Sequence, residues 1–125
     1  MAGKKKILIV DDEKNFTDMI KLNLEDADEY EVRVENEASK AVAAAKTFRP
    51  DLIFLDIIMP ELDGGEILSR LKNDVYTRDI PVVFLTAIVA EDENVLIGSG
   101  ISGYPFLSKP VSVVRLIDCI KRNIR

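Results

Sequence analysis

Histidine is absent from the 125 residues of this sequence, and cysteine occurs once. Without histidine the chain lacks the commonest general base and metal ligand, so its chemistry must rely on carboxylates, hydroxyls, lysine and backbone groups. Cys119 has no second cysteine with which to form an internal disulfide, which favours a reducing compartment.

Long apolar runs and an excess of positive charge are also absent. The apolar runs are much shorter than the roughly 20 residues that span a bilayer. The run of residues 7–10 ends at Asp11 and Asp12, so no signal peptide is visible. A formal net charge of −5 argues against direct binding to nucleic acid. We therefore expect a cytoplasmic protein that binds neither membranes nor nucleic acid directly.

The composition is that of a globular domain. Hydrophobic residues make up 47% of the chain and charged residues 31%, and a chain of 125 residues is long enough for one core but not for two. We expect residues 1–125 to form a single domain.

Short apolar runs alternate with helical patterns along the chain. The expected strands are residues 7–10, 30–34, 52–55, 82–85 and 104–107, and the expected helices are residues 13–26, 38–45, 67–71, 90–97 and 113–124. Ser112 is a candidate N-cap for the last helix. Five strands alternating with five helices predict an α/β fold with a doubly wound parallel sheet. In such folds the ligand site lies at the carboxyl ends of the strands.

Polar side chains stand at four of these strand ends. The first strand ends at Asp11, Asp12 and Glu13, the third at Asp56, the fourth at Thr86, and the fifth leads to Lys109. Carboxylates that lie close together repel one another, and a hard divalent cation such as Mg²⁺ relieves that repulsion. With a lysine and a hydroxyl beside them, these groups suit phosphoryl transfer to a carboxylate, a nucleophile that needs no base.

Each of these residues also has a purely structural explanation when it is taken alone. Asp11 or Asp12 could cap the first helix, and Asp56 could begin a turn. Thr86 could simply favour a strand, and Lys109 could be exposed to solvent. Four strand ends that carry complementary groups are better explained by one shared site.

Four motifs carry a resemblance to a known family. They are IVDDE at residues 9–13, DIIMPELDG at residues 56–64, LTA at residues 85–87 and LSKP at residues 107–110. With these motifs, nearly the whole chain resembles a response-regulator receiver domain of two-component phosphorelay systems. The resemblance implies a flavodoxin-like fold, with a five-stranded parallel sheet in the order 2-1-3-4-5 and five helices. It also implies a switch rather than an enzyme that turns over a small molecule.

The resemblance assigns Asp56 as the phosphoacceptor and Mg²⁺ as the cofactor. The implied metal ligands are Asp12, Asp56 and the backbone carbonyl of Ile58, with Asp11 acting partly through water. Thr86, the backbone N–H of Ala87 and Lys109 would bind the phosphoryl oxygens. The Lys109–Pro110 peptide bond is expected to be cis.

The readout of phosphorylation is expected to involve Thr86 and Phe106. The resemblance implies that movement of Thr86 is coupled to the aromatic residue three positions before Lys109, which is Phe106 in this chain. The alternative is that Phe106 is an ordinary residue of the hydrophobic core. Ile58 and Ile88 flank the path by which water would attack the phosphoryl group, and neither side chain can orient a water molecule. We therefore expect slow self-dephosphorylation.

The resemblance also implies partners. A sensor histidine kinase or a histidine phosphotransfer protein would donate the phosphoryl group, and a downstream protein would bind the face formed by the fourth helix, the fifth strand and the fifth helix. A phosphorylation-dependent dimer is a further expectation. The fourth helix has three consecutive apolar residues at 95–97, which indicate either a contact for a partner or one exposed apolar side chain in a short helix.

Three other functions fit these residues less well. A hydrolase of the haloacid dehalogenase type would carry Asp-x-Asp after the first strand, where this chain has Asp11-Asp12. A flavodoxin-like cofactor carrier would need a phosphate-binding loop there, where this chain has acids. A docking module that is not phosphorylated would not need the complete set of acceptor residues. We expect no output domain within these residues, and therefore either a stand-alone receiver or a domain of a longer protein.

Overall fold

A computed structural model describes residues 3–60, 62–86, 103–109 and 111–124. The strands are β1 (Lys5–Val10), β2 (Tyr30–Glu35), β3 (Leu52–Asp56), β4 (Val82–Thr86) and β5 (Phe106–Ser108). The helices are α1 (Lys14–Asp26), the 3-10 helix η1 (Ala38–Lys40), α2 (Ala41–Phe48), α3 (Gly64–Lys72) and α5 (Val113–Asn123). The expected fourth helix at residues 90–97 lies outside the described residues.

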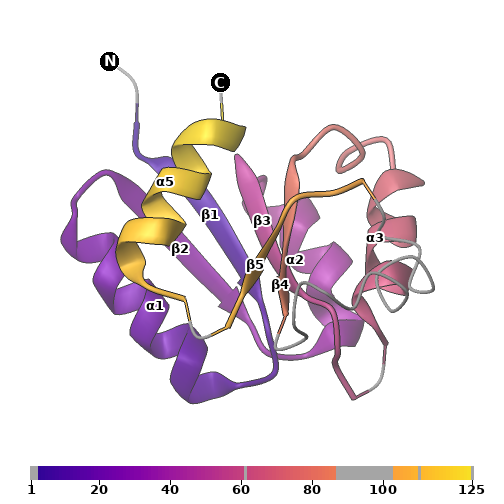
Figure 1. Cartoon of the computed structure of the whole chain (residues 1–125). Coiled ribbons are helices and arrows are strands. Elements are labelled where there is room, and N and C mark those ends of the chain that lie inside the picture. The colour runs from indigo at the N-terminus through magenta and orange to yellow at the C-terminus, as the bar shows by residue number, and fades with distance from the viewer. Residues whose placement is uncertain (1–2, 61, 87–102, 110, 125) are drawn as a thin grey trace.

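The five strands form one parallel sheet in the order β2-β1-β3-β4-β5 (Figure 1). This order confirms the topology that was expected from the sequence. β3 lies in the centre, paired with β1 on one side and β4 on the other. The strand order reverses between β1 and β3, and the carboxyl ends of these strands lie side by side there, where doubly wound sheets bind their ligands.

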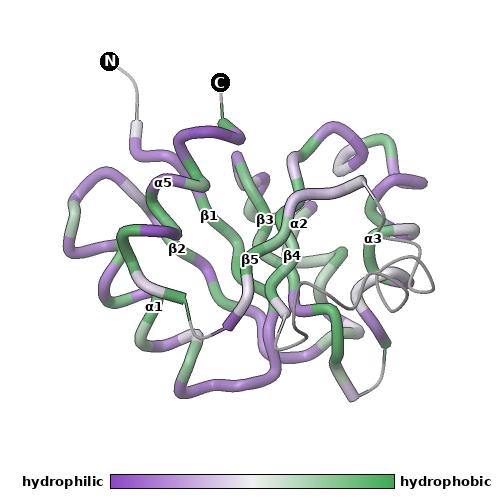
Figure 2. Tube along the Cα trace, in the orientation of Figure 1, coloured by the Kyte–Doolittle hydropathy of each residue, from purple (hydrophilic) through white to green (hydrophobic). Residues whose placement is uncertain are grey.

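Helices cover both faces of the sheet (Figure 1). Ile7 and Ile9 pack in one cluster with residues of α1 and α5, whereas Leu8 and Val10 pack in a second cluster with residues of α2 and α3. Because neither face of the central strands meets water, every position of β3 and β4 is buried. Figure 2 shows this as hydrophobic colour along β1, β3 and β4.

Local hydrogen bonds determine where two of the helices begin. The Asp63 side chain accepts a hydrogen bond from the backbone N–H of Glu66 at 2.8 Å, which caps α3. Ser112 accepts one from the backbone N–H of Arg115 at 3.2 Å, which confirms the cap expected for α5. Among the described residues, no helix combines the length and the apolar character that crossing a membrane requires.

Candidate functional site

Three carboxylates meet at the carboxyl edge of the sheet. Asp11 directly follows β1 and Asp56 is the last residue of β3, and both side chains are buried, whereas Asp12 is exposed. One carboxylate oxygen from each of the three lies within 4.8 Å of the other two. The structure therefore brings together the acidic residues that the sequence placed at separate strand ends.

Lys109 lies among these acids. Its Nζ atom is 2.6 Å from Asp11 Oδ2 and 3.5 Å from Asp56 Oδ2, and only 12% of its side chain is exposed. Its backbone N–H donates to the backbone carbonyl of Thr86 at 2.7 Å, which holds the lysine beside the end of β4. The alternative of a solvent-exposed lysine is therefore wrong.

The electrostatic balance of this site favours an added cation. Burial, and next the charge of Asp11, raise the pKa of Asp56 to about 6, although Lys109 opposes the shift. Burial by itself lowers the pKa of Lys109, but hydrogen bonds with Asp11 and Glu13 outweigh it and raise that pKa above its usual value. One lysine thus does not fully offset the repulsion between the buried carboxylates.

The oxygen atoms of the cluster fit a hard divalent cation. Asp11 Oδ2 is buried and lies 2.6 Å from Lys109 Nζ, while Asp11 Oδ1 accepts a hydrogen bond from the backbone N–H of Glu13 at 2.9 Å. Asp56 Oδ1 accepts a hydrogen bond from the backbone N–H of Ile58 at 3.2 Å, which leaves further lone pairs available. A donor set made of carboxylate oxygens suits Mg²⁺.

Of the remaining predicted residues, some lie in the part of the chain that the structure describes and others lie outside it. Thr86 ends β4 and is buried, and it pairs in register with Ser108 of β5, the residue before Lys109. Phe106 is half-buried against the core cluster of α2 and α3, a position that fits both the switch and the core interpretation. Ala87, Ile88 and Pro110 lie outside the described residues, so the phosphoryl-binding N–H of Ala87, the lifetime role of Ile88 and the cis Lys109–Pro110 bond stay predictions.

Two residues at the site were given no role from the sequence: Asn36 was not singled out, and Glu13 was noted only as part of the polar end of the first strand. The Asn36 side chain, just after β2, donates to the backbone carbonyl of Asp11 at 2.8 Å and to Thr17 Oγ1 at 3.0 Å. Glu13 Oε1 accepts a hydrogen bond from Lys109 Nζ at 2.7 Å. The position of Glu13 next to Asp12 was a usable signal, but nothing in the sequence indicated that Asn36 reaches β1.

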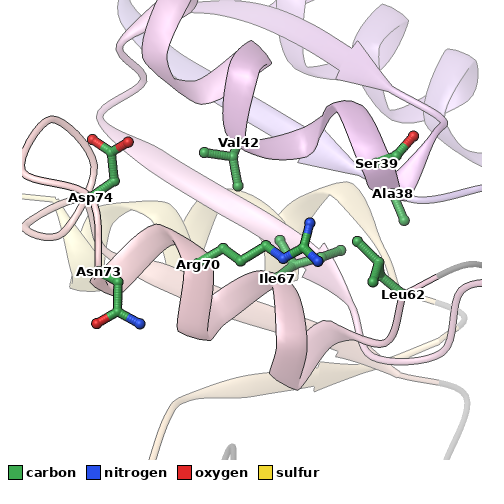
Figure 3. A pocket seen from close by; sticks show the side chains of 8 residues that line it. All are labelled: Ala38, Ser39, Val42, Leu62, Ile67, Arg70, Asn73 and Asp74. Carbon is green, nitrogen blue, oxygen red and sulfur yellow. The ribbon is translucent and has the colours of Figure 1, made fainter.

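A groove of about 430 Å³ between α2 and α3 is separate from this site (Figure 3). It is lined by Ala38, Ser39, Val42, Leu62, Ile67, Arg70, Asn73 and Asp74. Two of its charged side chains are paired with neighbours, Arg70 with Glu66 at 3.3 Å and Asp74 with Lys46 at 3.3 Å. None of its lining residues belongs to the acidic cluster.

Comparison with known proteins identifies the family. Residues 7–121 match the model of the response regulator receiver domain. The chain is 34% identical over 120 residues to the DNA-binding dual master transcriptional regulator RpaA of Synechocystis sp., covering 96% of this chain and 49% of that protein. It is 38% identical over 125 residues to the phosphate regulon transcriptional regulatory protein PhoB of Pseudomonas aeruginosa, covering 100% and 53%. The chain thus spans about half the length of these two regulators.

Shorter proteins match over nearly their full length. The polar-differentiation response regulator DivK of Brucella anthropi is 38% identical over 122 residues, which cover 94% of both chains. The chemotaxis protein CheY4 of Vibrio cholerae superposes with a TM-score of 0.85 at 27% identity, covering 98% of this chain and 100% of that one. This chain therefore belongs to the response regulator receiver domains, the phosphoacceptor switches of two-component systems.

Proposed function

We propose that Asp56 is the residue that accepts the phosphoryl group, and that the chain acts as a switch without turning over a small molecule. The observation that carries the proposal is the position of Asp56: it is buried at the end of the central strand, beside Asp11 and with Lys109 Nζ 3.5 Å away. The carboxylate is itself the nucleophile, so no histidine is needed to activate it.

In this proposal Asp11, Asp12, Asp56 and the carbonyl of Ile58 hold Mg²⁺. The cation would supply positive charge next to the phosphoryl oxygens. Two observations support the assignment: oxygens of Asp11, Asp12 and Asp56 lie within 4.8 Å of one another, and burial and the charge of Asp11 raise the pKa of Asp56 although Lys109 lies nearby.

Lys109 and Thr86 would bind the oxygens of the transferred group, together with the backbone N–H of Ala87. Lys109 is a compact charge on a flexible stem and already lies beside Asp56, so a small movement brings it to a phosphoryl oxygen. Thr86 lies at the end of the neighbouring strand, where a movement of its hydroxyl would be transmitted toward β5 and Phe106.

We further propose that a sensor histidine kinase or a histidine phosphotransfer protein donates the phosphoryl group. The downstream partner would contact a face to which β5 and α5 contribute, and phosphorylation could also favour a dimer through that face. The names of RpaA and PhoB connect those relatives with transcription, and that of DivK with polar differentiation. Because these relatives act in such different processes, the resemblance supports phosphorylation of this chain but does not indicate which process it controls.

The acceptor is tested by intact-protein mass spectrometry after incubation with Mg²⁺ and acetyl phosphate. We expect the wild type to gain one phosphoryl group and Asp56→Asn to gain none, while Asp51→Asn, an exposed aspartate just before β3, behaves as the wild type. Equal labelling of Asp56→Asn would contradict the proposal. Repeated hydrolysis of a small phosphate ester would instead favour a hydrolase.

A further inference from the structure

Lys109 contacts an acidic residue outside the predicted metal set. Glu13 Oε1 lies 2.7 Å from Lys109 Nζ, about as close as Asp11 Oδ2 at 2.6 Å and closer than Asp56 Oδ2 at 3.5 Å. The Glu13 side chain is 62% exposed, whereas that of Lys109 is 12% exposed. Glu13 therefore forms the solvent side of a nearly closed site around the ammonium group.

The backbone of Glu13 is held in place from both sides. Its N–H donates to Asp11 Oδ1 at 2.9 Å, and its carbonyl accepts from the N–H of Thr17 at 3.0 Å. Glu13 is the N-cap residue of α1, yet its side chain makes no capping hydrogen bond and reaches Lys109 instead. Polar side chains at this position usually accept a hydrogen bond from the first turn of the helix, but the Glu13 side chain binds Lys109 instead.

An aromatic ring completes the site. The centroid of the Phe16 ring lies 4.7 Å from Lys109 Nζ, within the range of a cation–π contact. Phe16 lies in the first turn of α1, so Glu13 and Phe16 approach the ammonium group from the same element. The amino end of α1 therefore offers Lys109 a resting position with contacts other than Asp56.

We propose that Glu13 and Phe16 hold Lys109 at this resting position before phosphorylation, so that Glu13 sets how readily Lys109 binds the phosphoryl group. The inference rests on the proposed function of Asp56. The Glu13 carboxylate competes with the phosphoryl oxygens for the same ammonium group, because both are anions that bind it through charge-assisted hydrogen bonds. Glu13 is accordingly a positioning residue that acts through Lys109.

The competition has two consequences of opposite sign when the Glu13 charge is removed. Without Glu13, Lys109 pairs more strongly with Asp11 and Asp56, so it competes better with Mg²⁺ for these carboxylates and Mg²⁺ binds less tightly. Once Mg²⁺ saturates the carboxylates, Lys109 is freer to bind an anion beside Asp56, so a phosphoryl analogue binds more tightly. A general loss of folding would weaken the binding of Mg²⁺ and of the phosphoryl analogue alike.

The test measures Mg²⁺ binding by isothermal titration calorimetry, and beryllofluoride binding at saturating Mg²⁺ by ¹⁹F NMR. For Glu13→Gln we expect Mg²⁺ affinity to fall and beryllofluoride affinity to rise, each by about twofold to fivefold, the range of one partly exposed ion pair. Glu13→Asp keeps the charge but shortens the side chain by one methylene group, so its carboxylate no longer reaches Nζ. We expect it to show most of the gain in beryllofluoride affinity.

Asp18→Asn is the matched control, because Asp18 lies on the same helix, is exposed, and pairs only loosely with Lys14 at 3.9 Å. Both affinities should stay at wild-type values in this variant. The inference is overturned if Glu13→Gln binds beryllofluoride no more tightly than the wild type. It is also overturned if Glu13→Asp equals the wild type, since long-range charge alone would then explain the gain. Failure of the wild type to bind beryllofluoride would instead overturn the function proposed for Asp56.

Discussion

A Cβ atom on Gly64 would lie 2.9 Å from the backbone oxygen of Asp56, so the first turn of α3 packs directly on the end of β3. Such an atom would also lie 2.9 Å from Cα of Ile57 and 3.1 Å from the Phe84 ring. The Gly64 N–H donates to the Ile57 carbonyl at 2.7 Å, which holds the two elements at this distance. The proposed acceptor is therefore positioned by a close approach of two backbones.

Gly64→Ala should destabilise the protein, because the new methyl group meets backbone atoms that cannot move aside easily. We expect the free energy of unfolding, measured by urea denaturation, to fall by about 1–3 kcal/mol. Helix propensity alone would instead raise the free energy of unfolding, by up to about 1 kcal/mol. Gly3→Ala is the control, since nothing lies within 4 Å of a Cβ atom there.

Asn36→Ala should weaken Mg²⁺ binding although Asn36 is not expected to touch the metal. The Asn36 amide holds the backbone carbonyl of Asp11 at 2.8 Å and thereby the loop that carries Asp11 and Asp12. Loss of one such outer contact lowers metal affinity by about tenfold or more in well-ordered sites. Calorimetric titration with Mg²⁺ measures the effect, with Asn23→Ala on the exposed face of α1 as the control. An unchanged affinity in a folded Asn36→Ala protein would contradict this role.

Asp56→Asn should stabilise the metal-free protein at neutral pH. The pKa of Asp56 is raised to about 6 in the folded state, chiefly by burial, from an ordinary value of 3.8. The folded state therefore holds the proton more tightly than the unfolded state between these values, and stability falls as the pH rises through that window. Removing the carboxylate should add about 3 kcal/mol to the free energy of unfolding at pH 7.

The same variant should show little gain at pH values below about 3, where Asp56 is protonated in the folded and the unfolded state. Urea denaturation of Asp56→Asn and the wild type at both pH values, without divalent cations, measures the difference. A gain of equal size at both pH values would show that packing, rather than charge, is responsible. Added Mg²⁺ should shrink the gain at neutral pH, because it stabilises the wild type.

Ile58→Asn should accelerate loss of the phosphoryl group. The Ile58 side chain is 62% exposed, two residues after the proposed acceptor, and has no polar atom with which to orient an attacking water. An amide there supplies a donor and an acceptor, so we expect dephosphorylation severalfold faster than in the wild type. The rate is followed by mass spectrometry after removal of acetyl phosphate. Val75→Asn, at a 63% exposed apolar residue outside the site, should leave the rate unchanged.

The parallel sheet and the edge that carries the site were predictable from local patterns, whereas the order of the strands came from the family resemblance. Leu52 to Leu55 form a continuous apolar run because β3 is covered on both faces, and the polar residue that ends this run, Asp56, lies at the carboxyl edge of the sheet. Parallel strands joined by right-handed crossovers place all such ends together. The predicted meeting of Asp11, Asp12, Asp56 and Lys109 follows from this rule and is confirmed.

Tertiary contacts decided what each of these residues does within the site. Taken alone, Lys109 was better explained by an exposed position. Its burial depends on contacts with residues far away in the chain, such as Glu13, which is 96 residues away. Asn36 reaches the Asp11 carbonyl only because β2 lies beside β1. The sequence by itself determined which chemical groups gather at one edge of the sheet, since periodicity and strand ends are local properties. Only the folded structure decided that Glu13 shares Lys109 with Asp11 and Asp56, because that contact depends on distances between elements far apart in the chain.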